Sequence, residues 1–257
     1  MKFIQHKLAK ILPILLIILL FSAQHIFCFS FETKNRIFKP KNNITKKTIF
    51  ISNPKNEYLP IELKMFRVKP SIKGEDNLAE DKNNFLIVPS QILLRPNEKQ
   101  SITIKWTGPR IISEEQQYKL SVKTISIKDK IKDKKLKKDK VKINFNIVTN
   151  YLYNFYVQPS LQNKKIQLTS VKFLKDSKEP KMKFSFINNG NSIYKFQEIE
   201  LELKPKYDSS KITTVSIKES KSFRNIFPKS TKQVEIPWKK TKDIMYWNGK
   251  ITKIKSK

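Results

Sequence analysis

Residues 85–106, FLIVPSQILLRPNEKQSITIKW, indicate the fold of this chain most clearly. Two apolar runs lie on either side of a polar segment at residues 95–100, and the second run alternates between apolar and polar side chains. Such alternation is typical of a β-strand with one buried face, and Pro and Asn are typical of turns. The stretch therefore predicts two strands joined in the manner of a hairpin.

The same pattern continues on both sides of this stretch. From residue 31 onward, short apolar runs alternate with turn residues, and little helical periodicity is present. Residues 71–84 are polar and predict a loop. The sequence thus predicts an all-β fold with two immunoglobulin-like sandwiches, the first over residues 31–158 and the second over residues 159–257. The expected strands lie within residues 36–38, 48–52, 61–68, 85–88, 91–94, 101–106, 118–127 and 142–157, then 164–174, 181–191, 194–204, 211–218, 232–238 and 247–254.

The first thirty residues predict a secretory signal peptide. Three lysines precede an apolar run at residues 11–23, which has the length of a signal-peptide core and is short for a membrane span. Cleavage is expected near Cys28 or Ser30, and stable membrane insertion is not expected afterwards. A retained N-terminal anchor is the alternative, because no clean cleavage motif follows the apolar run.

Removal of residues 1–30 restricts the chemistry that remains. The only histidines and the only cysteine of the chain, His6, His25 and Cys28, lie within this leader. A chain without them has no histidine-based catalytic triad, no catalytic thiol, no thiolate zinc site and no disulfide. The glutamates of EIELEL (198–203) share one face of an expected strand, as in a solvated sheet. We therefore expect no enzyme, no cofactor and no metal.

The charge of the chain is strongly positive but ambiguous in meaning. Its 53 basic and 22 acidic residues give a formal net charge of +31, and only five of the basic residues are arginine. Proteins that read nucleic acid rely on arginine, so we do not expect a nucleic-acid partner. The densest lysine run, at residues 128–142, is expected to be a solvated loop. A polybasic patch for anionic lipid or nucleic acid is the alternative for this run.

The order of the segments resembles the PapD-like periplasmic chaperones of the chaperone-usher pathway. Residues 85–106 and SEEQQYKLSVKTI (113–125) carry the resemblance, together with RIFKPKNNITKKTIFISN (36–53), NFYVQP (154–159), FSFINNGN (184–191) and IFPKSTKQVEI (226–236). The resemblance covers nearly all of the chain after the leader. It implies a boomerang of two immunoglobulin-like domains, a location in the periplasm and a pilus-type protein subunit as partner. An outer-membrane usher is a further partner that it implies.

The resemblance also assigns a task to one strand. In this family the chaperone completes a subunit that lacks a strand by lending an extended strand, whose alternate side chains fill the open groove. Residues 142–153 match that donor strand. Its expected donor face consists of Ile143, Phe145, Ile147, Thr149 and Tyr151. Alternation alone is equally typical of an ordinary core strand of the first domain.

Two charged residues acquire roles from the same resemblance. Family members hold the terminal carboxylate of the subunit with two cations, and Arg36 matches the first. A surface arginine on an edge strand is the alternative. The second cation has no match, because residues 152–154 read Leu-Tyr-Asn. Glu115 matches an acidic residue that helps to fix the interdomain angle, and a capping box at residues 113–116 is its alternative.

These observations together predict a non-enzymatic chaperone that binds pilus-type subunits by strand donation without ATP. The alternative is a cationic exported envelope protein of the same fold that holds anionic lipid or polymer through its lysines. Salt distinguishes the two, because the Debye length falls below about 5 Å at roughly 0.5 M salt and weakens exposed charge contacts.

Overall fold

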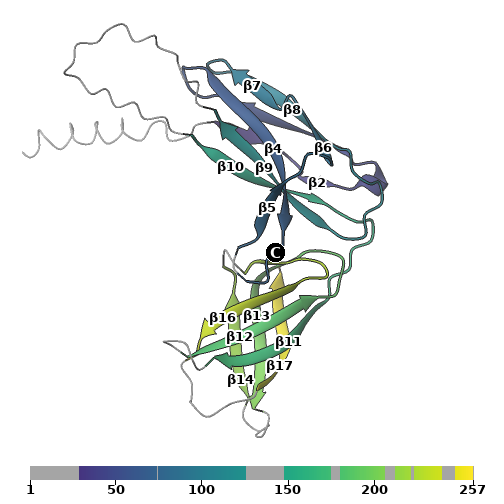
Figure 1. Ribbon diagram of the computed structural model, residues 1–257, viewed down its shortest axis with the longest axis vertical. Helices are drawn as coiled ribbons and strands as arrows, with labels where there is room; N and C mark the ends of the chain where they lie inside the picture. Colours follow the sequence, from purple (N-terminus) through teal and green to yellow (C-terminus); the bar gives the residue numbers. More distant parts are fainter. Residues whose placement is uncertain are drawn as a thin grey trace, which may run out of the picture.

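A computed structural model describes residues 29–73, 75–125, 148–174, 180–205, 212–220, 223–238 and 247–256. Within these residues the chain forms two β-sandwiches that follow each other in sequence and meet at an angle (Figure 1). The expected all-β fold with two domains in a bent arrangement is therefore confirmed. Residues 1–28 of the expected leader and the lysine-rich segment 128–142 lie outside the described residues. Among the residues described, no helix is long and apolar enough to span a membrane.

The first sandwich consists of two facing sheets. One sheet has the order β1-β3-β8-β6, and the other has the order β2-β10-β9-β4-β5, with β7 paired to β4. A short 3-10 helix, Pro40–Asn42, follows β2. The strands are β1 (Ser30–Glu32), β2 (Ile37–Phe38), β3 (Lys46–Ser52), β4 (Leu59–Lys69), β5 (Asn77–Glu80), β6 (Phe85–Val88), β7 (Gln91–Leu94), β8 (Lys99–Trp106), β9 (Gln116–Thr124) and β10 (Asn150–Val157).

The core of this sandwich follows from the alternation in the sequence. Ile102 and Ile104 of β8 are fully buried, and they face inward because alternate residues of a strand point to the same side. Phe85, Trp106 and Tyr118 make edge-to-face contacts with centroid distances of 4.8 to 6.0 Å. Burial raises the pKa of the Tyr118 hydroxyl to about 12. Residues 85–106 thus supply much of the centre of the first core.

The connection inside residues 85–106 differs from the expected hairpin. Strand β7 pairs with β4 in one sheet, whereas β8 pairs with β3 and β6 in the other. The turn at residues 95–98 therefore crosses from sheet to sheet, with Asn97 in the left-handed region at φ 58°. Both strands bury an apolar face. Because the inner faces of the two sheets pack against each other, a strand shows the same alternation whichever sheet it belongs to.

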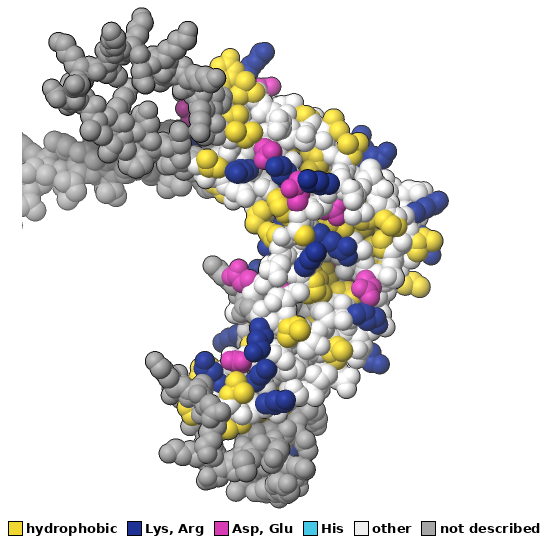
Figure 2. Space-filling view, viewed as in Figure 1, with side chains coloured by type: hydrophobic (Ala, Val, Ile, Leu, Met, Phe, Trp, Pro, Cys, Tyr) yellow, Lys and Arg dark blue, Asp and Glu magenta, His cyan; other side chains and the backbone are white. Residues whose placement is uncertain are grey.

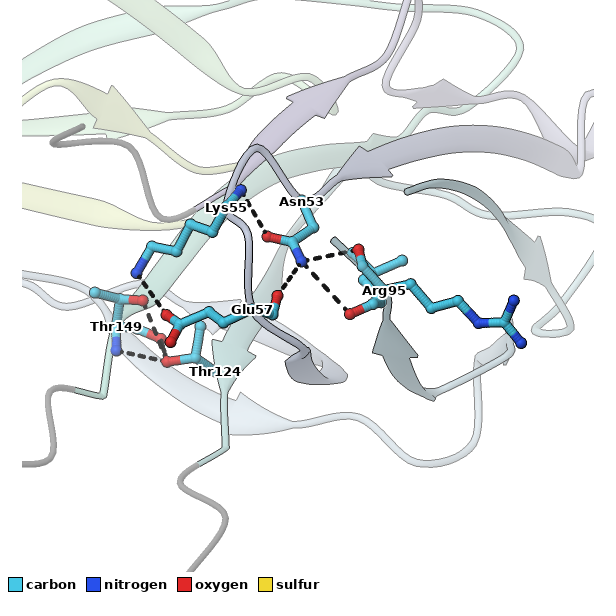
Figure 3. A network of polar contacts seen from close by, with 7 residues as sticks. Asn53, Lys55, Glu57, Arg95, Thr124 and Thr149 are labelled. Atoms are coloured by element: carbon cyan, nitrogen blue, oxygen red, sulfur yellow. Dashed lines mark hydrogen bonds and ion pairs between the residues drawn. The ribbon is translucent and has the colours of Figure 1, made fainter. Parts of the chain in front are cut away.

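The crossing turn is fastened by a buried side chain. Nδ2 of Asn53 donates to the carbonyl oxygens of Glu57 (2.7 Å) and Arg95 (2.9 Å), as Figure 3 shows. Asn53 is 1% exposed, and its backbone N–H donates to the Glu98 carbonyl at 2.9 Å. Because a buried amide is costly to leave unpaired, Asn53 fixes the loop after β3 against the turn before β8.

Three of the strands differ from what the sequence predicts. Strand β5 lies inside the expected loop 71–84, and its residues are mostly exposed, so the sequence shows no buried face there. Strands β1 and β15 have only three and two residues, which is too short for a visible period. Strand β1 overlaps the expected leader, since Ser30 pairs with Ser52 and Phe29 is 4% exposed in the core. Of the two expected cleavage positions, only the one at Cys28 preserves this packing.

The second sandwich has the same layered construction. One sheet has the order β11-β12-β16, and the other contains β13 with β14 and β15 as neighbours and β17 paired to β13. The strands are β11 (Ile166–Leu174), β12 (Lys181–Asn188), β13 (Tyr194–Pro205), β14 (Thr213–Lys218), β15 (Asn225–Ile226), β16 (Thr231–Pro237) and β17 (Trp247–Ser256). Its core is separate from the first, and Pro159, where we place the domain boundary, lies between the two cores.

The glutamates of residues 198–203 occupy one face of β13, as expected for an outer sheet face. Ile199, Leu201 and Leu203 on the opposite face are fully buried. In the register with β17, the three glutamates lie opposite Lys255, Lys253 and Lys250. In the register with β14, Glu198 also lies opposite Lys218, and opposite charges on neighbouring strands stabilise a sheet.

Positive charge is distributed rather than gathered on the visible surface. On the face shown in Figure 2, lysine and arginine side chains are spread over both sandwiches and are interspersed with acidic ones. In the outer face of the β3–β8 pair, Lys46 and Lys105 lie directly opposite each other. The described part of the face in Figure 2 therefore carries dispersed positive charge and no discrete basic site.

Candidate strand-docking site

The most distinctive backbone feature of the first sandwich is an open edge along β10. On one side β10 pairs with β9 over its whole length, from Asn150 to Val157. On the other side it pairs with β2 only at Tyr156 and Val157. In the described part of the chain, residues 150–154 of β10 therefore have no neighbouring strand on this side. An unpaired edge of this kind is a template for an added strand.

The hydrogen-bonding groups of this edge follow from its alternation. The N–H of Tyr156 donates to the Arg36 carbonyl and the N–H of Gln158 donates to the Phe38 carbonyl, both at 2.9 Å. Successive residues of a strand direct their N–H and C=O groups to opposite sides. The groups of Asn150, Leu152 and Asn154 thus point to the open edge.

The start of β10 is held firmly to β9. The N–H of Thr149 donates to Oγ1 of Thr124 (2.9 Å), as Figure 3 shows. The N–H of Thr124 donates to the Thr149 carbonyl, also at 2.9 Å. Both contacts lie on the β9 side, so they leave the opposite edge unobstructed. This pairing gives the open edge a rigid support, which lowers the entropic cost of adding a strand.

Aromatic residues of β1 and β10 cover the core beside this edge. Phe29 meets Tyr151 edge-on at a centroid distance of 4.9 Å, and Phe31 stacks on Tyr153 at 3.7 Å with an interplanar angle of 13°. Tyr151 is 38% exposed. Burial raises the pKa of the Tyr153 hydroxyl, Tyr151 acts in the same direction, and Arg36 acts against both. The apolar surface of the sandwich thus continues to the border of the open edge.

Arg36 lies at the end of the open edge, immediately before β2. Its Cζ is 5.6 Å from the Tyr153 ring centroid and 5.8 Å from that of Phe31. Aromatic rings attract a guanidinium group and restrict its motion, and the planar fork of arginine suits a carboxylate. The structure therefore places a positioned cation where residues 150–154 give way to the β2 pairing.

Only some of the other residues expected in the site lie within the described part of the chain. Thr149 and Tyr151 lie at the start of β10 and are described, whereas Ile143, Phe145 and Ile147 lie outside the described residues. Alternation places Tyr151 on the same face as Phe155 and Val157, which are fully buried in the first core. Within the described residues, Tyr151 of the expected donor face thus lies on the same side of β10 as the core residues.

Phe29 and Phe31 are site residues that the sequence alone does not reveal. The expected leader covers residues 1–30, and a strand of three residues carries no readable period. The aromatic residues just after the apolar run are the available signal. Their contacts with Tyr151 and Tyr153 place Phe29, just before β1, and Phe31, within β1, in the wall of this site.

Glu115 lies at the junction of the two sandwiches and is 5% exposed. Its Oε1 accepts from Nε2 of Gln158 (2.9 Å), and its Oε2 accepts from the N–H of Ile193 (2.8 Å) in the second sandwich. Its own N–H donates to the Asn191 carbonyl at 2.7 Å. The alternative of a capping box is wrong, because residues 113–114 form a bend with no helix after it and β9 begins at Gln116.

Lys195 adds a cation to the same junction. Its Nζ is 3.3 Å from the centroid of the Tyr156 ring. Burial lowers the pKa of Lys195, whereas the Glu115 carboxylate raises it and Lys164 lowers it. Tyr156, on β10, thereby connects the strand with the open edge to the second sandwich.

Replacement of Glu115 by Gln is expected to destabilise the protein by about 1–3 kcal/mol, because one carboxylate oxygen becomes an NH₂ group facing a buried donor. The measurement is the midpoint of chemical denaturation at neutral pH. Glu114→Gln is the matched control, since Glu114 is more exposed and adjacent in sequence. Equal midpoints for the two variants would contradict the assignment of Glu115 to the junction.

Comparison with known proteins identifies the fold. No family model matches the chain, and no curated protein matches it. Solved structures do match: a chain of the chaperone–tip adhesin complex of CFA/I fimbriae biogenesis superposes with a TM-score of 0.56 at 14% identity, covering 88% of this chain and 98% of that one. The fold is that of the fimbrial chaperones.

Two further structures support this conclusion. A chain of the CsuC–CsuE chaperone–tip adhesion subunit complex of the Csu pili of Acinetobacter baumannii matches with a TM-score of 0.53 at 13% identity, over 89% of this chain and 96% of that one. The E. coli chaperone DraB matches with a TM-score of 0.52 at 14% identity, over 89% and 97%. The fold expected from the resemblance to PapD-like chaperones is thus confirmed.

Proposed function

We propose that this chain is an exported chaperone that holds a pilus-type subunit by adding a strand across the open edge of β10. The observation that carries the proposal is the edge of residues 150–154 opposite β9, beside which the described part of the chain places no strand and at whose end Arg36 lies. The fold, which is shared with fimbrial chaperones, supports it. The location that fits this task is the periplasm, with delivery to an outer-membrane usher.

The direction of the added strand follows from β2. Strand β2 runs parallel to β10, and its first residue, Ile37, pairs with Tyr156. The bound subunit is called the client below. A client strand that pairs with residues 150–154 would lie on the same side of β10 as β2 and would end where β2 begins. If it runs parallel to β10, its C-terminal carboxylate meets the Arg36 guanidinium, whereas the opposite direction brings a positive N-terminus there. Charge therefore favours the parallel direction.

The donor face completes the client in this proposal. Ile143, Phe145 and Ile147 continue the alternation of Thr149 and Tyr151 and would fill the groove of a subunit that lacks one strand. Main-chain hydrogen bonds give affinity, and the alternate side chains set the register. Pairing itself supplies the free energy, so ATP has no role, and release occurs when another strand replaces the donor.

A single carboxylate anchor distinguishes this site from the two-cation anchor that the resemblance implies. Residues 152–154 supply no lysine, and Asn154 there accepts a hydrogen bond from Nε2 of Gln117 at 2.9 Å. One guanidinium offsets less of the desolvation cost of a carboxylate than two cations do. In this proposal the open edge and the donor face therefore carry a larger share of the affinity.

Retention of a client at high salt tests the proposal. The protein is captured from its own cell envelope in roughly 0.5 M salt, where exposed charge contacts are screened and strand pairing is not. We expect a small β-rich exported protein to remain bound in stoichiometric amount and to be named by mass spectrometry. Retention of only lipid or polyanion, and only at low salt, would overturn the proposal in favour of the cationic envelope protein.

A further inference from the structure

The hairpin formed by β4 and β5 extends from the first sandwich to the second. Figure 1 shows β5 directed toward the junction, away from the body of its own sheet. In the register of this hairpin, Lys69 lies opposite Asn77. Between these residues the chain turns back, and its described parts, 70–73 and 75–76, contact β16 of the second sandwich.

An ion pair joins the hairpin to β16. Nζ of Lys232 lies 2.9 Å from Oδ1 of Asp76, and the side chains are 3% and 20% exposed. Oδ1 of Asp76 also accepts from the N–H of Ser71 at 2.9 Å, which fixes the position of the carboxylate within the hairpin. A charge this deeply buried is destabilising when a charged partner is lost, so the pair holds the hairpin against β16.

A backbone hydrogen bond accompanies the ion pair. The N–H of Gln233 donates to the Ile72 carbonyl at 2.8 Å. Strand β16 pairs with β12 on its other side, so this contact occupies the outer edge of β16. The hairpin therefore covers part of an exposed strand edge as well as joining the two sandwiches.

The Asp76–Lys232 ion pair and the Glu115 contacts involve different segments of both sandwiches. Glu115 is bound to Ile193 and Asn191, which precede β13, whereas Asp76 is bound to β16. Val68, Ile193 and Phe227 form an apolar cluster of their own at the junction, with Tyr156 packed against it. Nδ2 of Asn225 on β15 also donates to Oε1 of Gln117 on β9 at 3.1 Å. The described part of the junction thus has polar attachments at β15, at β16 and at the segment before β13, in addition to an apolar contact.

We propose that the β4–β5 hairpin is a strut that fixes the angle between the two sandwiches through the Asp76–Lys232 pair, independently of Glu115. Contacts grouped in one part of a junction leave more rotation than contacts that also include a separate strand, so an attachment at β16 restricts the rotation further. Interfaces between domains of one chain are otherwise mobile by default. The strut does not depend on the proposed client, because its contacts lie entirely within this chain.

A distance measurement between the two sandwiches tests the strut. Spin labels are placed on cysteines introduced at two exposed positions, Gln91 of β7 and Thr214 of β14, with Cys28 replaced by Ser where it is retained. We expect one narrow distance for the parent protein. Asp76→Asn, which keeps the shape of the side chain and removes its charge, should broaden the distribution, and Lys232→Met should broaden it further.

The control is removal of an exposed ion pair of the first sandwich. Lys99→Met breaks the pair of Lys99 with Glu32, whose side chains are 48% and 58% exposed, and it should leave the distance distribution unchanged. Circular dichroism reports whether each variant is folded. If Lys232→Met does not fold, Asp76→Asn alone decides the result. A folded Asp76→Asn protein with the narrow distance of the parent would overturn the strut.

Discussion

The Leu152→Pro variant is expected to bind its client much more weakly while the fold of the first sandwich is retained. The N–H of Leu152 points to the open edge of β10, so its removal leaves the pairing of β10 with β9 intact. Proline is tolerated on edge strands when the missing N–H faces away from the ladder. Leu152→Pro therefore affects only the open edge of β10, where the client strand would pair.

The expected size of the effect follows from what the client strand would lose. One main-chain hydrogen bond contributes about 0.5–1.5 kcal/mol net, and the proline ring also obstructs the approach of the client backbone. We expect the Kd for the client recovered in the high-salt capture to rise about tenfold or more, which corresponds to ~1.4 kcal/mol or more. Competition between labelled and unlabelled client measures it.

Leu152→Ala is the matched control for this variant. It shortens the same side chain, which is 43% exposed, and it keeps the backbone N–H. We expect it to bind the client nearly as well as the parent protein. A client that binds both variants equally well would place its contact elsewhere than the edge of β10, and the melting temperatures of the two variants report whether the fold is intact.

The strands of this protein are readable from the sequence because their side chains alternate across half-buried sheets. Residues 101–106 and 199–203 show this clearly, with alternate isoleucines and leucines fully buried in the structure. Alternation reports which face of a strand is buried, but it does not report the neighbour with which the strand pairs. For this reason the sequence predicts a hairpin of β7 and β8, although the two strands lie in opposite sheets.

The candidate site can be predicted only in part from the sequence, for a related reason. A resemblance identifies Arg36, but the position of its guanidinium over the Tyr153 ring depends on a contact between residues more than a hundred positions apart. The ion pair of Asp76 with Lys232 is equally distant in sequence. A single sequence carries no signal for such contacts, and β5, with its exposed residues, gives no apolar period from which the hairpin could be inferred.

The Arg36→Ala variant is expected to weaken client binding about 10- to 100-fold, since hydrogen bonds to charged groups contribute about 1.5–3 kcal/mol. The loss arises because the client carboxylate would be drawn from water without a cation to receive it. Arg36→Lys should recover only part of the affinity, since an ammonium group lacks the planar fork that pairs with a carboxylate and stacks on Phe31 and Tyr153.

A double-mutant cycle separates this role from a structural one. The terminal carboxylate of the client is converted to a carboxamide, and each client form is measured with the parent protein and with Arg36→Ala. If the guanidinium binds the carboxylate, the amide client should be weakened with the parent protein and should show little further loss with Arg36→Ala. Additive losses would mean that Arg36 acts only through its packing on Phe31 and Tyr153, and the anchor would then have to be sought in another cation.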